Sequence, residues 1–296
     1  DENGSTLNEL ARLDTMVTVV DALNFLNDFG SEDTLVDRRI SRDEQDDRCV
    51  VDLLVDQIEF ADVIILNKID LVTIEQLNLV TGKIKGLNPQ AELIYSTFGK
   101  VPVKKVLNTD RFNMEQAQQA PGWLKELRGE HIPETEEYGI SSFVYTSRRP
   151  FHPDRFMEAL KTDWQGVIRS KGFFWLATRM DWAGNYSQAG KACRTETAGL
   201  WWAAMDESDW PEDQEQRQEI AELWQKPWGD RRQEIVVIGQ NINREAITKK
   251  FDDCLLTDKE MELGPEVWME FHDPFHAWQE VIDEVLQSEE ETLIIK

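Results

Sequence analysis

Short apolar runs alternate with helical patterns along the first part of the chain. Residues 16–20, 62–66 and 91–95 are rich in Val, Ile and Leu, which predicts three strands. The middle run, DVIIL, lacks polar alternation, as is typical of a parallel strand buried on both faces. Helices are expected up to about residue 60 and over 74–84, so strands and helices alternate and the sheet should be parallel.

Two further signals refine this part of the chain. The charged stretch over residues 27–48 is typical of a solvated loop, and Ser41 and Glu44 within it have the spacing of a capping box for the helix that follows. Thr73 is expected to cap the helix over 74–84, and Gly86 and the Asn-Pro pair at 88–89 to stop it.

The pattern changes after about residue 122. A polar, acidic segment over 126–138 reads as a linker, and strands and helices then follow without strict alternation, which favours an α+β domain. Strands are expected at 140–146, 167–178, 199–204 and 234–239, and helices at 153–160, 209–224, 243–254 and 274–286. We therefore predict four parts: a parallel-sheet domain over 1–125, the linker over 126–138, an α+β domain over 139–258 and a tail with a helix over 259–296.

Composition limits the possible partners. The chain has 57 acidic and 32 basic residues and a formal charge of −25, which opposes binding to nucleic acid or to anionic membranes. No apolar run approaches the roughly 20 residues that a bilayer requires. The three cysteines are far apart in sequence, which favours reduced thiols and a cytoplasmic setting. A single nucleotide held by backbone groups remains compatible with this charge.

The sharpest motif is Asn67-Lys68-Ile69-Asp70, directly after the buried DVIIL run. Guanine presents two neighbouring donors, N1–H and the N2 amino group, and the two oxygens of one carboxylate match both. Asp70 can fill that role, while Asn67 braces the loop and the alkyl stem of Lys68 covers the ring. Adenine has an acceptor at N1, so Asp70 would reject it. The alternative is a capped turn with Asp70 as an exposed acid.

The next loop, Ser96-Thr97-Phe98-Gly99, follows the third strand. Ligands of parallel sheets bind at the carboxyl ends of the strands, where this loop, Asp21 and the NKID loop should meet. Ser96 and Thr97 are therefore candidates to give backbone donors to the base oxygen O6. An ordinary turn is the alternative.

These motifs occur in a wider resemblance. The runs TVVDALNF, VVDLLVDQIEFADVIILNKIDLV and LNPQAELIYSTFGKV resemble the CobW-like family of metal-handling P-loop GTPases. The runs SSFVYTSRRPFHPDRF, SKGFFWLATR and EIVVIGQNINREAITKKFDDCLL resemble the CobW C-terminal domain, and SKGFFWLATR is similar to the zinc-responsive, zinc-chaperone branch. The resemblance covers nearly the whole chain. It implies GTP, Mg²⁺ and Zn²⁺ as cofactors of the full-length protein, with none assigned to this chain alone, and a metal-requiring client protein and a guanine nucleotide as partners.

Two family motifs are missing. No Gly-Lys pair of this sequence is followed by Ser or Thr, as a phosphate-binding P-loop requires, and the family's CxCC metal motif is absent. Because both lie upstream in the family, we expect the chain to lack the first third of a longer protein. We then expect no GTP hydrolysis by this chain alone, and a parallel sheet with an unpaired edge or an exposed apolar face.

Two functions follow as hypotheses. The first is a GTP-dependent chaperone or insertase that delivers metal, zinc above all, to client proteins. The alternative is a non-catalytic client-binding module without nucleotide turnover. We assign no catalytic residue and no metal ligand within this chain.

Several weaker features have ordinary explanations beside functional ones. His272 and His276 have the i, i+4 spacing of a metal pair, but His272 precedes an expected helix start at Pro274. Arg148, Arg149 and Arg155 surround His152 and suit an acidic partner, the other domain or ordinary surface pairing. Cys254 fits a buried small apolar position. Four tryptophans in the second half suit core packing or a partner surface: Trp175, Trp182, Trp201 and Trp202.

Overall fold

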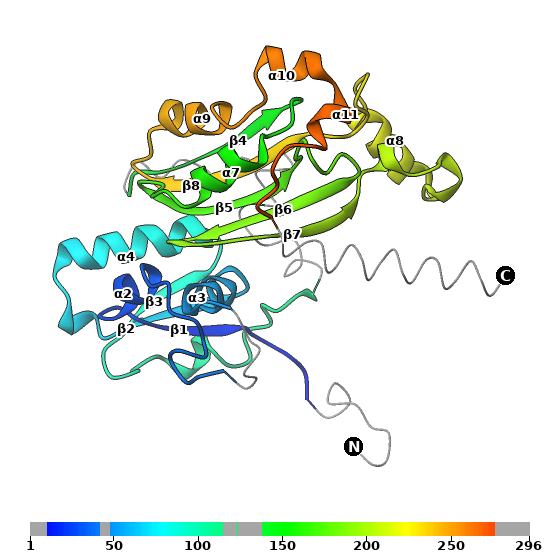
Figure 1. Ribbon diagram of the computed structural model, residues 1–296. Coiled ribbons are helices and arrows are strands. Elements are labelled where there is room, and N and C mark those ends of the chain that lie inside the picture. Colours follow the sequence, from blue (N-terminus) through cyan, green and yellow to red (C-terminus); the bar gives the residue numbers. More distant parts are fainter. Residues whose placement is uncertain (1–10, 42–47, 115–122, 124–137, 276–296) are drawn as a thin grey trace.

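The computed structural model describes residues 11–41, 48–114, 123 and 138–275, and these residues form two sheets with helices (Figure 1). The first sheet has three parallel strands and the second has five antiparallel strands. We call residues 11–114 the parallel-sheet unit and residues 138–275 the antiparallel-sheet unit. The predicted order of an α/β part followed by an α+β part is confirmed. The predicted linker lies outside the described residues, apart from Tyr138, and the four domain boundaries stay predictions.

The parallel sheet has the order β1-β2-β3, with β1 at Val17–Asp21, β2 at Val63–Asn67 and β3 at Glu92–Tyr95. All three predicted strands are confirmed to within one residue. The four aliphatic residues of β2 are buried on both faces, because helices and loops cover the central strand. Strand β1 pairs with Asn67 through its last residue, so these two strands end at the same level.

Three helices pack around this sheet: α2 at Phe25–Phe29, α3 at Val50–Glu59 and α4 at Ile74–Leu87. Helix α3 buries Val51, Val55 and Ile58, which recur at helical spacing. The α4 cap is confirmed, since Thr73 accepts a hydrogen bond from the Gln76 amide at 3.2 Å. Helix α2 was missed within the charged stretch, and α3 begins at Val50 rather than after Ser41. Glu44 lies outside the described residues.

The antiparallel sheet has the order β4-β8-β5-β6-β7. Its strands are β4 at Ile140–Ser147, β5 at Val167–Phe174, β6 at Trp182–Ala189, β7 at Ala192–Leu200 and β8 at Gln233–Gln240. The predicted strand at 199–204 is wrong beyond Leu200, where β7 ends, because residues 202–204 form a 3-10 turn, and the β6–β7 hairpin before it was not predicted. Both hairpin strands consist mostly of small and polar residues, so no apolar run marked them.

Helices cover one end and one face of this sheet: α7 at Pro153–Leu160, α8 at Gln214–Leu223, α9 at Arg244–Asp252, α10 at Asp258–Leu263 and α11 at Pro265–Trp268. The first three were predicted, and the last two were not. Pro274 and Phe275 are not helical, and the rest of the predicted tail helix lies outside the described residues. No helix among the described residues is long and apolar enough to cross a membrane.

Strand β8 lies between two cores. Val236 and Ile238 share a core with the parallel-sheet unit, whereas Ile235 and Val237 pack with the aromatic core beneath α7 and α9. Helix α4 lies between the two sheets and contacts β8, β4 and β5 (Figure 1). The approach is close at Gly82, where an added Cβ would stand 2.7 Å from the Gln240 side-chain nitrogen. The two units therefore share one continuous apolar interface.

A buried ion pair crosses the same interface. Arg169 of β5 donates from Nε to Glu59 Oε1 of α3 at 2.9 Å, and both side chains are only 4% exposed. Arg169 also donates to Ser187 Oγ at 2.9 Å. Burial raises the pKa of Glu59, and the nearby charge of Arg169 opposes that effect. The pair is therefore a specific, fully desolvated connection between the two units.

The parallel sheet also has the expected apolar exposure. Within the described residues β1 pairs only with β2, and the Val19 side chain in the middle of β1 is 62% exposed. Met16 and Val17 are exposed as well. An edge strand with exposed apolar side chains is a surface that sheet proteins normally cover.

Candidate functional site

The tips of the three parallel strands bring together the polar residues that the sequence placed there. Asp21 ends β1, Asn67 ends β2, and the loop from Ser96 follows β3. The Ala22 amide donates to the Asn67 carbonyl at 2.9 Å, and the Ser96 amide donates to the Leu66 carbonyl at 2.9 Å. These bonds continue the sheet ladder into the loops, so the loops are held at one edge.

Asn67 braces the neighbouring loop. Its Oδ1 accepts the Gly99 amide at 3.0 Å, which ties the exit loop of β3 to the end of β2. Phe98 and Gly99 both have a positive φ, at 55° and 65°. A bulky residue in this region is uncommon and needs such external support.

Lys68 follows with a left-handed backbone, at φ 62°, and its side chain turns toward β1. Its Nζ donates to Asp21 Oδ2 at 2.6 Å. Asp21 also accepts the amides of Leu23 and Asn24 at 3.0 and 3.3 Å and the Asn24 side chain at 2.8 Å. Although partial burial opposes them, the hydrogen bonds from Lys68 and Asn24 prevail and lower the pKa of Asp21.

Asp70 lies in the 3-10 turn Ile69–Leu71 and is exposed. Among the described residues no donor or cation contacts its carboxylate. Both of its oxygens therefore stay available as acceptors at the tips of the strands, three residues after the Asn67 brace. That arrangement is compatible with both interpretations of the motif, a base reader and an exposed acid of a capped turn.

Ser96 and Thr97 differ from each other in their surroundings. Ser96 is buried, and its Oγ donates to the Lys100 carbonyl at 3.1 Å, so its side chain stabilises the loop. Thr97 is half-buried, and its carbonyl accepts the Lys100 amide at 3.2 Å. Within the part of the chain that the structure describes, the amides of Thr97 and Phe98 have no acceptor. They are backbone donors of the kind predicted for a base oxygen.

Comparison with known proteins places these residues in a family. Residues 2–95 match the model described as "CobW/HypB/UreG, nucleotide-binding domain", and residues 140–255 match "Cobalamin synthesis protein cobW C-terminal domain". A "Zinc-regulated GTPase metalloprotein activator 1" from Dictyostelium discoideum is 43% identical over 279 residues, covering 93% of this chain and 58% of that protein. The chain belongs to the CobW family.

Other relatives agree with this membership. A "Zinc chaperone Rv0106" from Mycobacterium tuberculosis is 30% identical over 271 residues, covering 91% of this chain and 63% of its own length. The chain thus spans about six tenths of the length of these curated relatives. The crystal structure of a Zn(II)-bound YjiA GTPase from E. coli matches 83% of this chain and 62% of that chain, at 16% identity and a TM-score of 0.33. That last match is too distant to add to the assignment.

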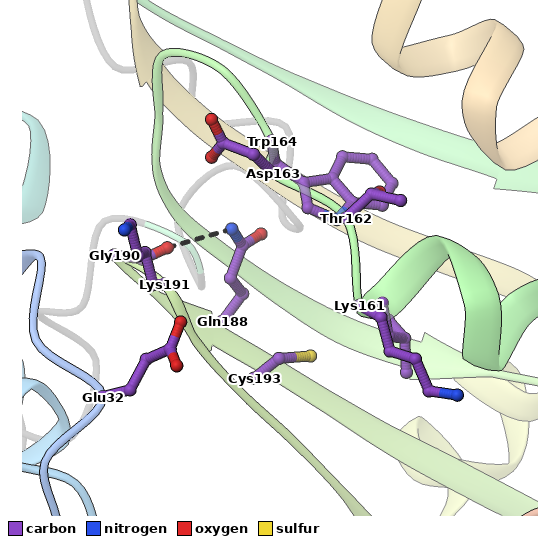
Figure 2. A pocket seen from close by; sticks show the side chains of 10 residues that line it. Glu32, Lys161, Thr162, Asp163, Trp164, Gln188, Gly190, Lys191 and Cys193 are labelled. Atoms are coloured by element: carbon purple, nitrogen blue, oxygen red, sulfur yellow. Dashed lines mark hydrogen bonds between the residues drawn. The ribbon is translucent and has the colours of Figure 1, made fainter.

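A second polar site of this CobW-family chain is a small cavity of about 190 Å³ (Figure 2). Glu32 of the parallel-sheet unit and Gln188 and Cys193 of the β6–β7 hairpin line it. The Gln188 amide donates to the Gly190 carbonyl at 3.2 Å, as Figure 2 shows. Burial raises the pKa of the Cys193 thiol to about 12, so this sulfur stays protonated at neutral pH.

The residues weighed for metal binding do not gather. Among the described residues no group of three or more His, Cys, Asp or Glu side chains could hold a metal ion. His272 instead contacts Asp154, with 2.6 Å between its Nδ1 and Oδ1, and His276 lies outside the described residues. Cys254 is buried, as predicted.

The basic cluster around His152 is engaged within its own unit. Arg149 pairs with Asp258 at 2.8 Å, Arg155 pairs with Glu260 at 2.8 Å, and Arg148 donates to two backbone carbonyls. Ordinary pairing therefore explains these arginines. Of the four tryptophans weighed as core or surface, Trp175 and Trp201 are buried, which confirms the core interpretation for them, while Trp182 and Trp202 are partly exposed.

Sequence reasoning placed Asp21 at the strand tips but gave it no role. Its contact with Lys68 depends on the left-handed backbone of Lys68, and no sequence pattern predicts that conformation for a lysine. The only available signal was that Asp21 ends a β-branched run in a parallel sheet, where ligand sites lie.

Proposed function

We propose that the tips of the parallel strands bind the guanine base of GTP, and that this site serves a GTP-dependent chaperone that delivers zinc to client proteins. Asp70 accepts from N1–H and the N2 amino group, Asn67 braces the loop, Lys68 covers the ring, and the amides near Thr97 donate to O6. The observation that carries the proposal is that, among the described residues, the exposed carboxylate of Asp70 and the amides of Thr97 and Phe98 have no partner at the edge of a parallel sheet.

The amides and the carboxylate at the strand tips match the guanine base better than they match the ribose or the phosphates of GTP. The amides and carboxylate match the guanine edge, but this sequence contains no P-loop motif, so we assign no residue to the phosphates or to Mg²⁺. When bound, Mg²⁺ neutralises phosphate charge in phosphoryl transfer. Zinc enters the proposal as cargo, on the strength of the zinc named for the related proteins. The three cysteines are free thiols, which supports a cytoplasmic setting.

A direct test compares nucleotides on the 296-residue chain. Ligand-observed NMR titration should show GDP binding about 10–100 times more tightly than ADP, since two charge-assisted hydrogen bonds separate the bases. Absolute affinity should be weak, with a Kd on the order of 1 mM, because only the base is read. Equal binding of GDP and ADP would contradict the proposal.

A substitution that inverts one hydrogen bond sharpens this test. Asp70→Asn replaces one acceptor by a donor, so it should lose GDP and gain xanthosine diphosphate, whose C2 carbonyl accepts from the new amide. Asp62→Asn, an acid at the opposite end of β2, serves as the control and should leave both affinities unchanged.

The second candidate is a client-binding module without nucleotide turnover, and the missing P-loop motif is the observation that favours it. It predicts no base preference and no effect of Asp70→Asn in the same titration. The two functions are therefore separated by one measurement.

A further inference from the structure

Two carboxylates are candidate partners for the Lys68 ammonium, one near it in sequence and one on the neighbouring strand. Asp70 is two residues away in the same turn, and Asp21 ends the neighbouring strand. The Lys68 ammonium contacts Asp21, with Nζ and Oδ2 at 2.6 Å, whereas Asp70 has no cation partner among the described residues. The choice of partner decides whether the Asp70 oxygens are neutralised or free.

Asp21 is well suited to hold the ammonium in place. Two backbone amides and the Asn24 side chain already fix its carboxylate, at 2.8–3.3 Å. Its backbone is paired with Asn67 in the β1–β2 register, one residue before Lys68. Asp21 is therefore a rigid anchor, in contrast to an acid on a mobile surface side chain.

The direction of the lysine stem follows from this anchor. The backbone of Lys68 starts at the end of β2, and its ammonium ends at the tip of β1, so the four methylene groups run across the strand tips between them. A lysine stem laid over a surface presents an apolar strip, while its charged end meets a partner or water. Such a strip would form one apolar wall of the site for a flat base beside Asp70.

We propose that Asp21 is a positioning residue of the guanine site: it holds the Lys68 ammonium so that the stem lies as a wall for the base and the charge stays away from Asp70. This inference rests on the proposed function. Its contribution is to binding rather than to folding, because a part-exposed ion pair of this kind adds little stability.

The test combines two substitutions in the 296-residue chain, with GDP titration by NMR and thermal unfolding as readouts. Asp21→Asn removes the anchoring charge, and we expect the GDP Kd to rise about tenfold with little change in the unfolding midpoint. Lys68→Met keeps an unbranched stem without a charge that needs an anchor. In that background Asp21→Asn should have no further effect on GDP binding.

The outcomes separate this inference from the proposed function. A tenfold loss on Asp21→Asn that persists in the Lys68→Met background would show that Asp21 acts by another route, and no loss in either background would remove its role; both overturn the inference while the GDP preference stands. If the unsubstituted chain binds GDP and ADP equally, the base site itself fails. Asp62→Asn, at the opposite end of β2 from the strand tips, is the control and should leave GDP binding unchanged.

Discussion

Several charged side chains of the antiparallel-sheet unit pair within that unit, although Arg169 and Arg194 pair across to the other one. The strand tips of the parallel-sheet unit, by contrast, leave Asp70 without a partner among the described residues. Arg155 meets Glu260, Arg179 meets Asp273, and Arg232 meets Glu234. The cores differ as well. Aliphatic side chains fill the parallel-sheet unit, while stacked aromatic rings fill the space beneath α7 and α9.

The difference separates two kinds of polar group. Where donors and acceptors are matched internally, they support a rigid scaffold and offer little to a ligand. Where a rigid edge leaves a carboxylate and amides unmatched, the same chemistry is available for recognition. The contrast supports our proposal that the parallel-sheet unit binds the ligand, and the predictions below test each side of the contrast.

The largest expected effect compares two phenylalanines. Phe156 is fully buried and stacks on Phe151 with ring centroids 4.5 Å apart, whereas Phe98 at the strand tips is 84% exposed. Phe156→Ala should lower the free energy of unfolding by about 3–5 kcal/mol, through lost burial and a cavity. Phe98→Ala should change it by less than about 0.5 kcal/mol. Denaturant unfolding measures both, and equal losses would contradict the contrast between the two units.

The next effect concerns the ion pair that joins the units. Arg169→Met leaves Glu59 buried without its main partner and should cost about 3 kcal/mol, the lower end of the usual range. Lys171 also favours the ionised form of Glu59, which softens the loss.

The matched control for that pair is the double variant Glu59→Leu with Arg169→Met. Because an apolar pair can replace a buried ion pair at little cost, it should recover most of the stability that Arg169→Met loses. Denaturant unfolding of the two single variants and the double variant gives the coupling free energy. Strictly additive losses would mean that the two side chains do not act as a pair.

The sequence predicted an element of the fold well where the signal for that element is local in the chain. The strand at β2 and the cap at Thr73 were found because burial on both faces and the capping box leave local patterns. Helix α2 was missed, and so were the strands β6 and β7. WAGNYSQA and ACRTETAGL consist mostly of small and polar residues, and they become strands because β6 pairs with β5 and β7 pairs with β6.

The candidate site divides along the same line. Asn67, Lys68 and Asp70 are candidates because of a motif, and Ser96 and Thr97 because of their place after a strand. The burial of the Ser96 hydroxyl and the Asp21–Lys68 contact depend on backbone angles and on strand register, which the sequence states only indirectly. A local sequence pattern does not predict contacts between residues that are far apart in the chain.

A smaller effect is a pH dependence in the antiparallel-sheet unit. Hydrogen bonds from Arg155 and Thr257 lower the pKa of Glu260 from 4.5 to about 2. Because the ionised form is favoured in the folded state, Glu260 stabilises the protein above about pH 4.5, and this contribution is lost as the pH falls toward 2. After allowance for solvent screening it amounts to about 1–2 kcal/mol.

The variant Glu260→Gln isolates this contribution. Its unfolding free energy should lie below that of the unsubstituted chain at pH 7, and the gap should close as the pH is lowered through the acidic range. Glu262→Gln changes an exposed acid of the same helix and should show no gap at either pH. A gap for Glu260→Gln that stays constant with pH would rule out the titration of this carboxyl as its cause.

The smallest effect compares the first turns of two capped helices, one in each unit. Thr73 caps α4 three residues after Asp70, and Thr257 caps α10 with Glu260 as the reciprocal partner. Either change to Ala should cost about 1 kcal/mol, while Thr73→Ser and Thr257→Ser keep the hydroxyl and should cost less. Amide hydrogen exchange distinguishes the Thr73→Ala variant from the Thr257→Ala variant, because Asp70 lies in a short turn that the Thr73 cap directly follows. Thr73→Ala should speed amide exchange through residues 69–76 more than Thr257→Ala does around α10, where Arg155 and Trp268 also bind Glu260. If the α10 amides respond as strongly, the turn that carries Asp70 depends on its neighbouring cap no more than α10 does, and this contrast between the two units is lost.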